Sequence, residues 1–273
     1  MAKFAPYRLK KSLGQHFLKD DAVCLKIVAA LQENPFSQLV EVGPGGGALT
    51  KHLVKIPGIT FVAVELDDEK VEYLHHTFPA LQNKIIHKDF LELEPPFEGK
   101  FTLIGNFPYN ISSEILFKAI DWKEQVECLI GMFQKEVAQR VAAPPGSKVY
   151  GVTSALIQAY FTVDYLFDVP PESFNPPPKV MSGVIRMMPK ISRTAEAGTD
   201  ANPAEGFENT IPQMRSDRHY KILVKTAFNQ RRKQLRNAVK SLFDETVLQD
   251  DIFTKRAEQL SIHDFAMLTF KMR

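Results

Sequence analysis

From Ser37 to about Lys190, short runs rich in β-branched residues alternate with amphipathic stretches. This alternation is typical of βαβ units, in which helices cover a mostly parallel sheet. Strands are predicted over residues 38–42, 60–65, 84–87, 101–105 and 126–133, and helices near 20–31, 48–55, 67–77, 112–120 and 134–142. Two further extended segments, 161–169 and 179–188, should form an antiparallel hairpin at the sheet edge. An α/β, Rossmann-like fold with seven strands follows.

The remainder of the chain changes character. Residues 191–214 are dominated by Ser, Thr, Ala, Gly, Asn, Pro and Glu without periodicity, which predicts a linker or a flexible loop. Helical periodicity returns from Asp217 without strand signals. We therefore expect an α/β domain over 1–190, a linker over 191–215 and a small helical domain over 216–273.

Positive charge is segregated. Residues 1–19 carry five Lys or Arg and no acid, and residues 215–240 carry nine with one acid, although the whole chain has a net charge of only +2. Such segregation indicates a polyanionic partner such as RNA, with two solvated basic segments as the alternative. Lys10, Lys11, Arg231, Arg232, Lys233 and Arg236 are the candidate phosphate contacts, the last four on one expected helix.

Several classes of protein are disfavoured. No apolar run approaches the roughly 18 residues of a membrane helix, and no signal-peptide core follows the basic N-terminus. Two cysteines, Cys24 and Cys128, make neither a disulfide framework nor a metal cluster, so we expect no metal and a reducing, cytoplasmic location.

A glycine-rich turn follows the first predicted strand, at Gly43-Pro44-Gly45-Gly46-Gly47. Glycines there let the backbone turn sharply and approach a ligand at the start of a helix. The spacing Gly43-x-Gly45-x-x-Ala48 also satisfies a loose dinucleotide pattern. The turn alone therefore leaves NAD, S-adenosylmethionine and a simple tight turn open.

Acidic residues end the next two predicted strands. Glu65 is placed to accept hydrogen bonds from ribose hydroxyls, and Asp89 to accept from an adenine amino group. Together with the glycines they describe an adenosine-binding crevice at the carboxyl edge of the sheet. The alternative is that both acids only cap the helices that follow.

The tetrapeptide Asn106-Phe107-Pro108-Tyr109 follows the fourth predicted strand. The Asn106 side-chain oxygen and a backbone carbonyl, of Pro108 or Phe107, can accept both hydrogens of an exocyclic amine while Tyr109 stacks on its heterocycle. This is the chemistry of methyl transfer to an amino group of a flipped-out base. Phe174, beside three prolines, is the candidate second stacking face, or else an ordinary core residue.

Motifs in register extend this interpretation over nearly the whole chain outside 191–214. They are Gly14-Gln15-His16-Phe17-Leu18, Glu41-Val42-Gly43-Pro44-Gly45, Val64-Glu65-Leu66-Asp67, Asn106-Phe107-Pro108-Tyr109, Phe174-Asn175-Pro176-Pro177-Pro178-Lys179-Val180 and Phe228-Asn229-Gln230-Arg231-Arg232-Lys233-Gln234-Leu235-Arg236. In these motifs the chain resembles the ribosomal RNA adenine dimethyltransferases, specifically the bacterial KsgA/RsmA family.

The resemblance implies a class I methyltransferase fold. The enzyme would use S-adenosylmethionine to dimethylate N6 of two adjacent adenosines in the 3′-terminal hairpin loop of 16S rRNA, with a role in small-subunit biogenesis. His16 and Leu18 would border the cofactor, Gly43 would lie under its methionine part, Gly45 would belong to the same loop, Glu65 would bind its ribose, Asp89 its adenine, and Asn106 would lie beside the sulfonium.

Three positions depart from the family pattern as the resemblance gives it. His16 stands where Asn is frequent, and Phe107 replaces the commoner Leu. Met181-Ser182-Gly183 replaces the more usual Asp-Ser after Pro-Lys-Val.

Alternative functions remain at this stage. A DNA adenine-N6 methyltransferase would share the tetrapeptide chemistry, but it more often has an acidic first residue and a DNA-reading domain. The chain could instead act chiefly as an assembly factor that binds the immature small subunit. A nicotinamide dehydrogenase shares the glycines but lacks a hydride-transfer site here. In each case we expect a monomer.

Overall fold

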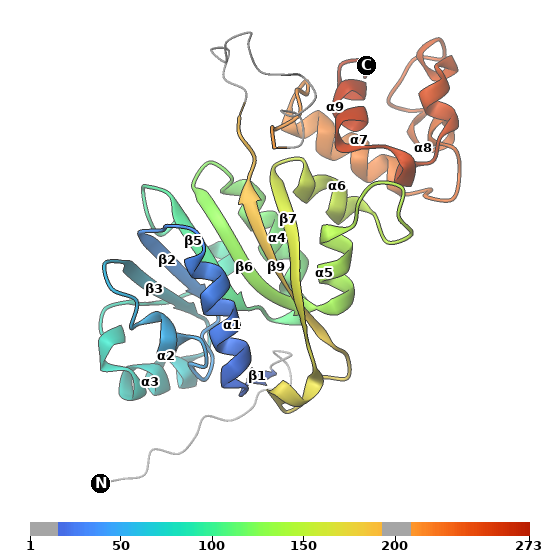
Figure 1. Cartoon of the computed structure of the whole chain (residues 1–273). Coiled ribbons are helices and arrows are strands. Elements are labelled where there is room, and N and C mark those ends of the chain that lie inside the picture. Colours follow the sequence, from blue (N-terminus) through green and yellow to red (C-terminus); the bar gives the residue numbers. More distant parts are fainter. Residues whose placement is uncertain (1–15, 193–208) are drawn as a thin grey trace. The chain divides into compact units, whose positions relative to one another are not determined.

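The structure is a computed structural model, and it describes residues 16–192 and 209–273 (Figure 1). By its internal contacts the chain divides into two compact units. The first contains residues 16–138 and 164–188, and the second contains 139–163 with the described residues from 189 onward. The predicted three-part division stays a prediction. Residues 139–163, expected in its first part, group with the C-terminal helices, and most of the predicted linker lies outside the described residues.

The first unit is built on a seven-stranded sheet with the order β4-β3-β2-β5-β6-β9-β7. Its strands are β2 (Gln38–Val42), β3 (Thr60–Glu65), β4 (Ile85–His87), β5 (Phe101–Asn106), β6 (Val126–Gln134), β7 (Phe161–Val169) and β9 (Ser182–Pro189). The neighbouring strands β4, β3, β2, β5 and β6 pair in parallel, and β9 runs antiparallel to β6. The predicted α/β class and mostly parallel sheet are confirmed, with β7 at the edge.

The strand order reverses direction between β2 and β5. From β2 the chain progresses outward through β3 to β4, and then returns to place β5 on the other side of β2. A crevice opens at such a switch point, outside the carboxyl ends of the strands, and ligands of open α/β sheets bind there. The glycine-rich turn after β2 and the tetrapeptide after β5 consequently lie next to each other.

Helices cover both faces of the sheet (Figure 1). They are α1 (Asp21–Gln32), α2 (Thr50–Leu53), α3 (Asp68–Thr77) and α4 (Ser112–Asp121). Helix α5 (Lys135–Ala142) begins in the first unit and continues into the second. Asp20 caps the N-terminus of α1, because its carboxylate accepts from the backbone N–H of Ala22 (3.0 Å) and Val23 (3.3 Å). Helix α2 is shorter than predicted because the glycine-rich turn extends to residue 49.

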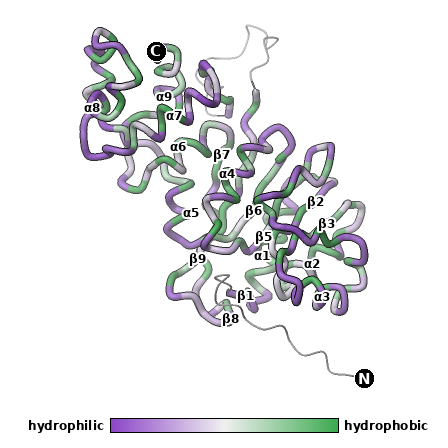
Figure 2. The backbone as a smooth tube through the Cα atoms, turned by 180° about the vertical axis from the view of Figure 1, so that it is seen from behind, coloured by the Kyte–Doolittle hydropathy of each residue, from purple (hydrophilic) through white to green (hydrophobic). Residues whose placement is uncertain are grey.

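Because successive side chains of a strand point to opposite faces of the sheet, apolar residues form a core on each face. Ile104, Ile130 and Met132 belong to the cluster that buries α1, while Leu103 and Leu129 point to the opposite face, where α4 packs. Figure 2 shows hydrophobic residues along the central strands β5 and β6 and mostly hydrophilic residues in the connecting loops.

A two-stranded sheet joins distant parts of the chain. Strand β1 (Phe17–Leu18) pairs antiparallel with β8 (Phe174–Asn175), so that Phe17 lies opposite Asn175 and Leu18 opposite Phe174. The Ser173 hydroxyl donates to Asp20 at 3.0 Å beside this pair. The sequence did not predict these strands, because two residues are too few for a periodic signal. They place His16 beside the main sheet.

The second unit contains α6 (Val152–Gln158), α7 (Asp217–Phe228), α8 (Leu235–Val239) and α9 (Ile262–Thr269). Helix α6, which the sequence analysis missed, belongs here because the Tyr220 hydroxyl of α7 donates to the Ala155 carbonyl at 3.0 Å. Within α7 to α9 the predicted all-helical character is present. The expected helix bearing residues 231–236 is wrong, since α7 ends at Phe228 and a turn precedes α8.

Shorter 3₁₀ helices complete the described parts, at Pro79–Leu81, Phe90–Glu92, Tyr109–Ile111, Pro171–Ser173, Val247–Gln249, Asp251–Thr254 and Ala257–Gln259. None of the helices in residues 16–192 and 209–273 has both the length and the apolar character needed to cross a membrane.

Two leucines of α1 offer a matched test of the packing. Leu31 is 2% exposed and belongs to the core cluster, whereas Leu25 is 51% exposed. We expect Leu31→Ala to lower the free energy of unfolding by about 2–5 kcal/mol, because the deletion leaves a cavity. Leu25→Ala should change it by about 0.5 kcal/mol or less. Urea titrations that give the two variants equal losses would contradict this assignment of the buried face.

Candidate active site

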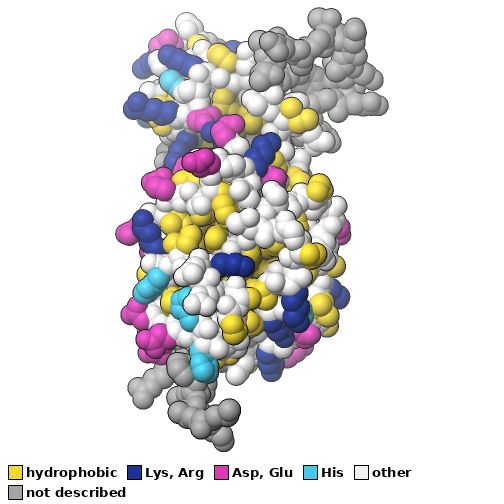
Figure 3. All heavy atoms as spheres, turned by 90° about the vertical axis from the view of Figure 1, so that its left-hand side faces the viewer, with side chains coloured by type: hydrophobic (Ala, Val, Ile, Leu, Met, Phe, Trp, Pro, Cys, Tyr) yellow, Lys and Arg dark blue, Asp and Glu magenta, His cyan; other side chains and the backbone are white. Residues whose placement is uncertain are grey.

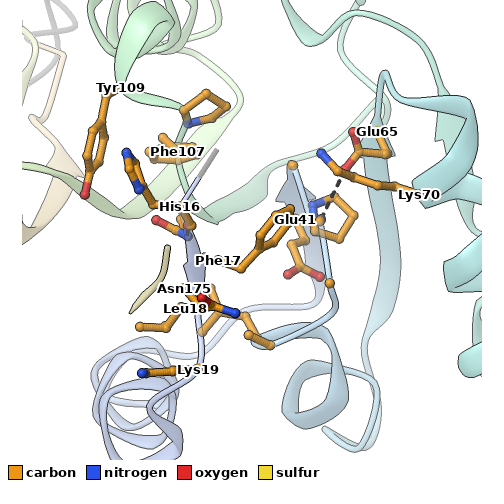
Figure 4. A pocket seen from close by; sticks show the side chains of 18 residues that line it. His16, Phe17, Leu18, Lys19, Glu41, Glu65, Lys70, Phe107, Tyr109 and Asn175 are labelled. Carbon is orange, nitrogen blue, oxygen red and sulfur yellow. Dashed lines mark hydrogen bonds between the residues drawn. The ribbon is translucent and has the colours of Figure 1, made fainter. Parts of the chain in front are cut away.

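A cavity of about 300 Å³ opens at the carboxyl ends of β2, β3 and β5 (Figure 4). Its volume is at the lower end of the range for small-molecule sites, about 300–1,000 Å³. Its lining includes His16, Phe17, Leu18, Glu41, Gly43, Gly45, Glu65, Lys70, Asn106, Phe107, Pro108, Tyr109 and Asn175. All of them belong to the first unit.

The glycine-rich turn forms the floor between β2 and α2. Gly43 and Gly45 have φ of +67° and +55°, the left-handed region that side chains with a Cβ rarely adopt. A Cβ on Gly45 would also lie 3.0 Å from the Phe17 ring. The turn therefore requires glycine at Gly45 for both backbone conformation and space.

Glu65 ends β3 and is buried, at 6% exposure. Its carboxylate accepts from the backbone N–H of Gly45 (3.1 Å), Leu66 (3.0 Å) and Asp67 (3.1 Å). These bonds compensate a buried negative charge and fix it at the cavity wall. A fixed carboxylate with remaining acceptor capacity suits a pair of ribose hydroxyls.

Asp89 lies differently from Glu65. Its carboxylate accepts from Leu91 N–H at 2.8 Å and caps the 3₁₀ helix Phe90–Glu92. It is not among the residues that line the cavity. One oxygen of Asp89 therefore caps a helix, as the alternative reading of this residue expected. Its contact to adenine stays a prediction.

Glu41 is an acidic residue of the cavity that the sequence analysis did not single out for a role. It is 2% exposed, and the Thr50 hydroxyl donates to it at 2.7 Å. Burial raises the pKa of Glu41 to about 8, and the bond from Thr50 opposes this shift. Glu41 is therefore largely protonated at neutral pH.

Asn106 is the last residue of β5. Its side-chain nitrogen donates to the His16 carbonyl at 3.0 Å. Since a carbonyl can only accept, the amide nitrogen must face His16, and the amide oxygen is left for a ligand. Within the described part of the chain, no donor bonds to that oxygen.

The two candidate backbone acceptors differ in their hydrogen bonding. The Pro108 carbonyl accepts from Ile111 N–H at 3.3 Å, and it shares the single hydrogen of the Ser112 hydroxyl, at 3.2 Å, with the Tyr109 carbonyl, at 3.1 Å. Among residues 16–192 and 209–273, no donor bonds to the Phe107 carbonyl. A carbonyl has two lone pairs, so the geometry favours Phe107 as the second acceptor and leaves Pro108 the task of stiffening the turn.

Tyr109 lines the cavity beside Asn106. Its hydroxyl shares a hydrogen bond with Ser182 Oγ at 2.5 Å, and Ser182 is fully buried. Burial raises the pKa of the Tyr109 phenol, so the ring stays neutral. A neutral ring held at its hydroxyl end is suited to stacking on a heterocycle.

His16 and Leu18, the predicted N-terminal contacts, both line the cavity. Phe174 does not: it is 1% exposed, pairs with Leu18 and belongs to the core cluster. Phe174 is therefore a core residue in this conformation, which was the alternative to a stacking role. Its neighbour Asn175 lines the cavity instead.

Lys70 is a further cavity residue that sequence reasoning missed. It is 3% exposed, and its ammonium lies 5.3 Å from the centroid of the Phe17 ring. Lys70 lies on α3, and only the fold brings it to the glycine-rich turn, so no local pattern indicates its position. Figure 4 shows it beside Glu65.

The predicted phosphate contacts belong to the second unit or lie outside the described residues. Arg231 is paired with Glu258 (2.6 Å) and also donates to the Lys148 carbonyl, whereas Arg232 and Lys233 are exposed. Arg236 is half-buried, and Lys10 and Lys11 lie outside the described residues. On the face shown in Figure 3, basic and acidic side chains are interspersed.

The strand order, the glycine-rich turn, Glu65 and the tetrapeptide together define a class I methyltransferase with an amino group as its acceptor. Residues 7–200 match the family model described as Ribosomal RNA adenine dimethylase. The chain belongs to the ribosomal RNA adenine dimethylase family.

Curated relatives agree with this assignment, and a solved structure agrees with the fold. The chain is 48% identical to the Ribosomal RNA small subunit methyltransferase A of Phocaeicola vulgatus over 95% of this chain and 88% of that protein. It is 45% identical to the protein of the same name from Cytophaga hutchinsonii, over 96% of both chains. A dimethyladenosine transferase from Plasmodium falciparum shares the fold, with a TM-score of 0.73, 24% identity and coverage of 92% of this chain and 94% of that chain.

These findings confirm the predicted family, fold class and chemistry, which is methylation of rRNA adenine with S-adenosylmethionine as donor. They select this interpretation over the nicotinamide dehydrogenase and the DNA methyltransferase.

Glu41 predicts a pH dependence of stability. Its pKa is about 8 in the folded chain against an ordinary value of 4.5, so between these values the folded state binds the additional proton. Stability from this group is therefore present below pH 4.5 and is lost as pH rises toward 8, at about 1.4 kcal/mol per pH unit.

Glu41→Gln removes that dependence. In urea titrations at several pH values between 5 and 8.5, the free energy of unfolding of the variant should increase relative to that of the natural protein as pH rises. A difference between the two that is constant with pH would mean that Glu41 is ionised in the folded chain.

Proposed function

We propose that the enzyme transfers methyl groups to N6 of two adjacent adenosines in the 3′-terminal hairpin loop of 16S rRNA, giving N6,N6-dimethyladenosine and S-adenosylhomocysteine. The observation that carries the proposal is the Asn106 side chain, whose nitrogen donates to the His16 carbonyl so that its oxygen is left to accept from a ligand, in a cavity that Phe107 also lines.

The residues present fit the donor. Glu65, held by three backbone N–H groups, would bind the ribose hydroxyls, and the turn at Gly43 and Gly45 would let the methionine part approach the backbone. His16 and Leu18 would border the cofactor from β1. The cofactor would supply an electrophilic methyl group on a sulfonium.

The adenine amino group needs activation, because its lone pair is delocalised into the ring. Hydrogen bonds from N6 to the Asn106 oxygen and the Phe107 carbonyl would favour a tetrahedral nitrogen with its lone pair directed at the methyl group. Both acceptors are fixed before the substrate arrives, so they stabilise the charge that develops during transfer. The proton can leave after transfer, because methylation makes the nitrogen acidic, and we assign no general base.

The target adenosine must leave its stack to reach Asn106. Tyr109, fixed through Ser182, is the proposed stacking face. Phe174 as the opposite face would require a rearrangement of the β1–β8 pair, because its ring is buried.

Affinity for rRNA is proposed to come from cations that neutralise phosphates. The Arg231–Glu258 pair gives Arg231 a role within the second unit, so Arg232 and Lys233 are the cations of this group presented to solvent. Arg236, Lys10 and Lys11 stay predicted contacts.

We propose the immature small ribosomal subunit as the partner, with the enzyme acting in the cytoplasm as a monomer. A second function, a checkpoint in subunit assembly with methylation secondary, is favoured by the segregated positive charge of residues 215–240. Both functions use the same RNA-binding surface.

Replacement of Asn106 tests the chemistry. Asn106→Ala should lower methyl transfer to small subunits by about 100-fold or more, because one preorganised acceptor is lost. Binding of S-adenosylhomocysteine, measured by calorimetry, should fall far less than methyl transfer, because Glu65 and the glycine-rich turn, which would hold most of the cofactor, are unchanged. Asn110→Ala, an exposed neighbour in the next turn, is the control and should transfer methyl groups at the natural rate. Near-normal transfer by Asn106→Ala would remove Asn106 from the chemistry.

The second unit's role in RNA binding is tested by salt dependence. Changing Arg232 and Lys233 together to Gln should weaken RNA binding and reduce the slope of log K against log salt by about 1–2. The paired change of Lys55 and Lys100, exposed lysines of the first unit, is the control of equal charge. Filter binding that gives both pairs the same slope would argue against a specific contact at residues 232 and 233.

A further inference from the structure

We propose that Lys70 is a further cofactor-binding residue, whose ammonium donates a hydrogen bond to a ribose hydroxyl of S-adenosylmethionine beside Glu65. This inference rests on the proposed function, and it names a second protein group for the ribose that is expected at Glu65.

Lys70 occupies a core-facing position of α3. The buried residues of this helix are Lys70 and Leu74, which lie on one face, and the helix packs against β3 and β4. A lysine that is only 3% exposed is rare, because burial of its charge must be compensated. In the first turn of a helix, the positive end of the dipole also disfavours a cation. A position that is unfavourable on both counts is typical of a functional site.

Hydrogen bonds connect the start of α3 to Glu65. The Asp67 N–H donates to Glu65 Oε1 at 3.1 Å, and the Asp67 carbonyl accepts from the Lys70 N–H at 3.0 Å. The Asp67 carboxylate also caps the helix by accepting from the Glu69 N–H at 3.1 Å. The backbone of Lys70 is thereby fixed relative to the Glu65 carboxylate. Figure 4 shows the Lys70 side chain extending from α3 into the cavity, beside Glu65.

The Phe17 ring lies close to the ammonium of Lys70, with 5.3 Å from the nitrogen to the ring centroid. This cation–π contact offsets part of the cost of burial. Phe17 itself packs against Gly45, whose N–H donates to Glu65 Oε2 at 3.1 Å. Lys70 and Glu65 are therefore held at the same wall of the cavity, next to the glycine-rich turn.

The two charged groups complement each other as partners for a hydroxyl. A ribose hydroxyl has one hydrogen to donate and lone pairs that accept, whereas a carboxylate such as Glu65 can only accept. The ammonium of Lys70 can only donate. A hydroxyl between them would donate to Glu65 and accept from Lys70, and each bond would strengthen the other.

The cofactor contains a second acceptor for a cation, the carboxylate of its methionine part. In the proposed function this part lies at the turn formed by Gly43 and Gly45, while the ribose lies at Glu65. The position of Lys70 beside Glu65 therefore favours the ribose (Figure 4). Lys19, the other lysine of the lining, is exposed and lies beyond Leu18, away from Glu65.

A set of ligands combined with one variant tests the contact. Lys70→Met removes the ammonium but keeps a long, unbranched side chain on the buried face of α3. Lys84→Met, at an exposed lysine of the first unit, is the matched control. Calorimetry measures the Kd of S-adenosylhomocysteine, of its 2′-deoxy and 3′-deoxy forms, and of 5′-methylthioadenosine, which lacks the amino-acid part.

Lys70→Met should weaken binding of S-adenosylhomocysteine roughly 10- to 150-fold, the range for a hydrogen bond to a charged group. Binding of 5′-methylthioadenosine should weaken by the same factor. For one of the two deoxy ligands, the variant and the natural protein should agree within about twofold, because the partner of Lys70 is already missing. In turnover, KM for S-adenosylmethionine should rise while kcat is retained, since the lost bond is present before and during transfer.

The control Lys84→Met should match the natural protein in each of these measurements. The unfolding midpoint of ligand-free Lys70→Met should stay close to the natural value, because Glu65 keeps its three N–H donors.

Three results would overturn the inference. Unchanged binding of S-adenosylhomocysteine by Lys70→Met would remove Lys70 from the cofactor site. Equal losses for S-adenosylhomocysteine and both deoxy ligands, with or without a lowered unfolding midpoint, would show that Lys70 does not bond to the ribose. A loss that disappears with 5′-methylthioadenosine would assign Lys70 to the methionine carboxylate instead.

Each of these results leaves the proposed function standing, provided that the natural protein dimethylates the adenosines of the small subunit. A natural protein that binds S-adenosylhomocysteine but transfers no methyl group to the subunit would instead overturn the proposed function.

Discussion

The hydrogen bond from the Asn106 side chain to the His16 carbonyl is the interaction on which the site depends. It determines which end of the amide faces the cavity, because the carbonyl can only accept. It also ties the end of β5 to β1, which in turn pairs with β8. Three segments that are distant in sequence thereby meet at Asn106, whose side-chain oxygen would accept a hydrogen bond from the substrate amine.

The sheet explains why this acceptor lies next to a nucleotide site. The order of strands reverses between β2 and β5, so the glycine-rich turn and the tetrapeptide occupy adjacent strand ends. Glu65, on the next strand, is fixed by backbone N–H groups, one of them from Gly45. The donor and acceptor halves of the reaction therefore share a rigid edge, and methyl transfer requires little more than correct placement of two ligands.

Much of this was predictable from the sequence because the relevant signals are local. The alternation of apolar residues predicted β2, β3 and β7 with the bounds that the structure has, and the tetrapeptide indicated its chemistry directly. Features that depend on distant contacts were not predictable. These include the β1–β8 pair, the grouping of α6 with α7 and the position of Lys70. For Phe174 the sequence left a stacking role and a core position open, and the fold decides for the core. The choice of Phe107 over Pro108 also required the hydrogen bonds of Ile111 and Ser112.

A crystal structure of the enzyme with S-adenosylhomocysteine and an RNA hairpin carrying the target adenosine tests the central claim most directly. The account predicts N6 within hydrogen-bonding distance, about 2.7–3.2 Å, of the Asn106 amide oxygen and the Phe107 carbonyl, with the amide nitrogen still on His16. An adenine whose N6 contacts other groups, or an Asn106 oxygen turned away from the cavity, would contradict it.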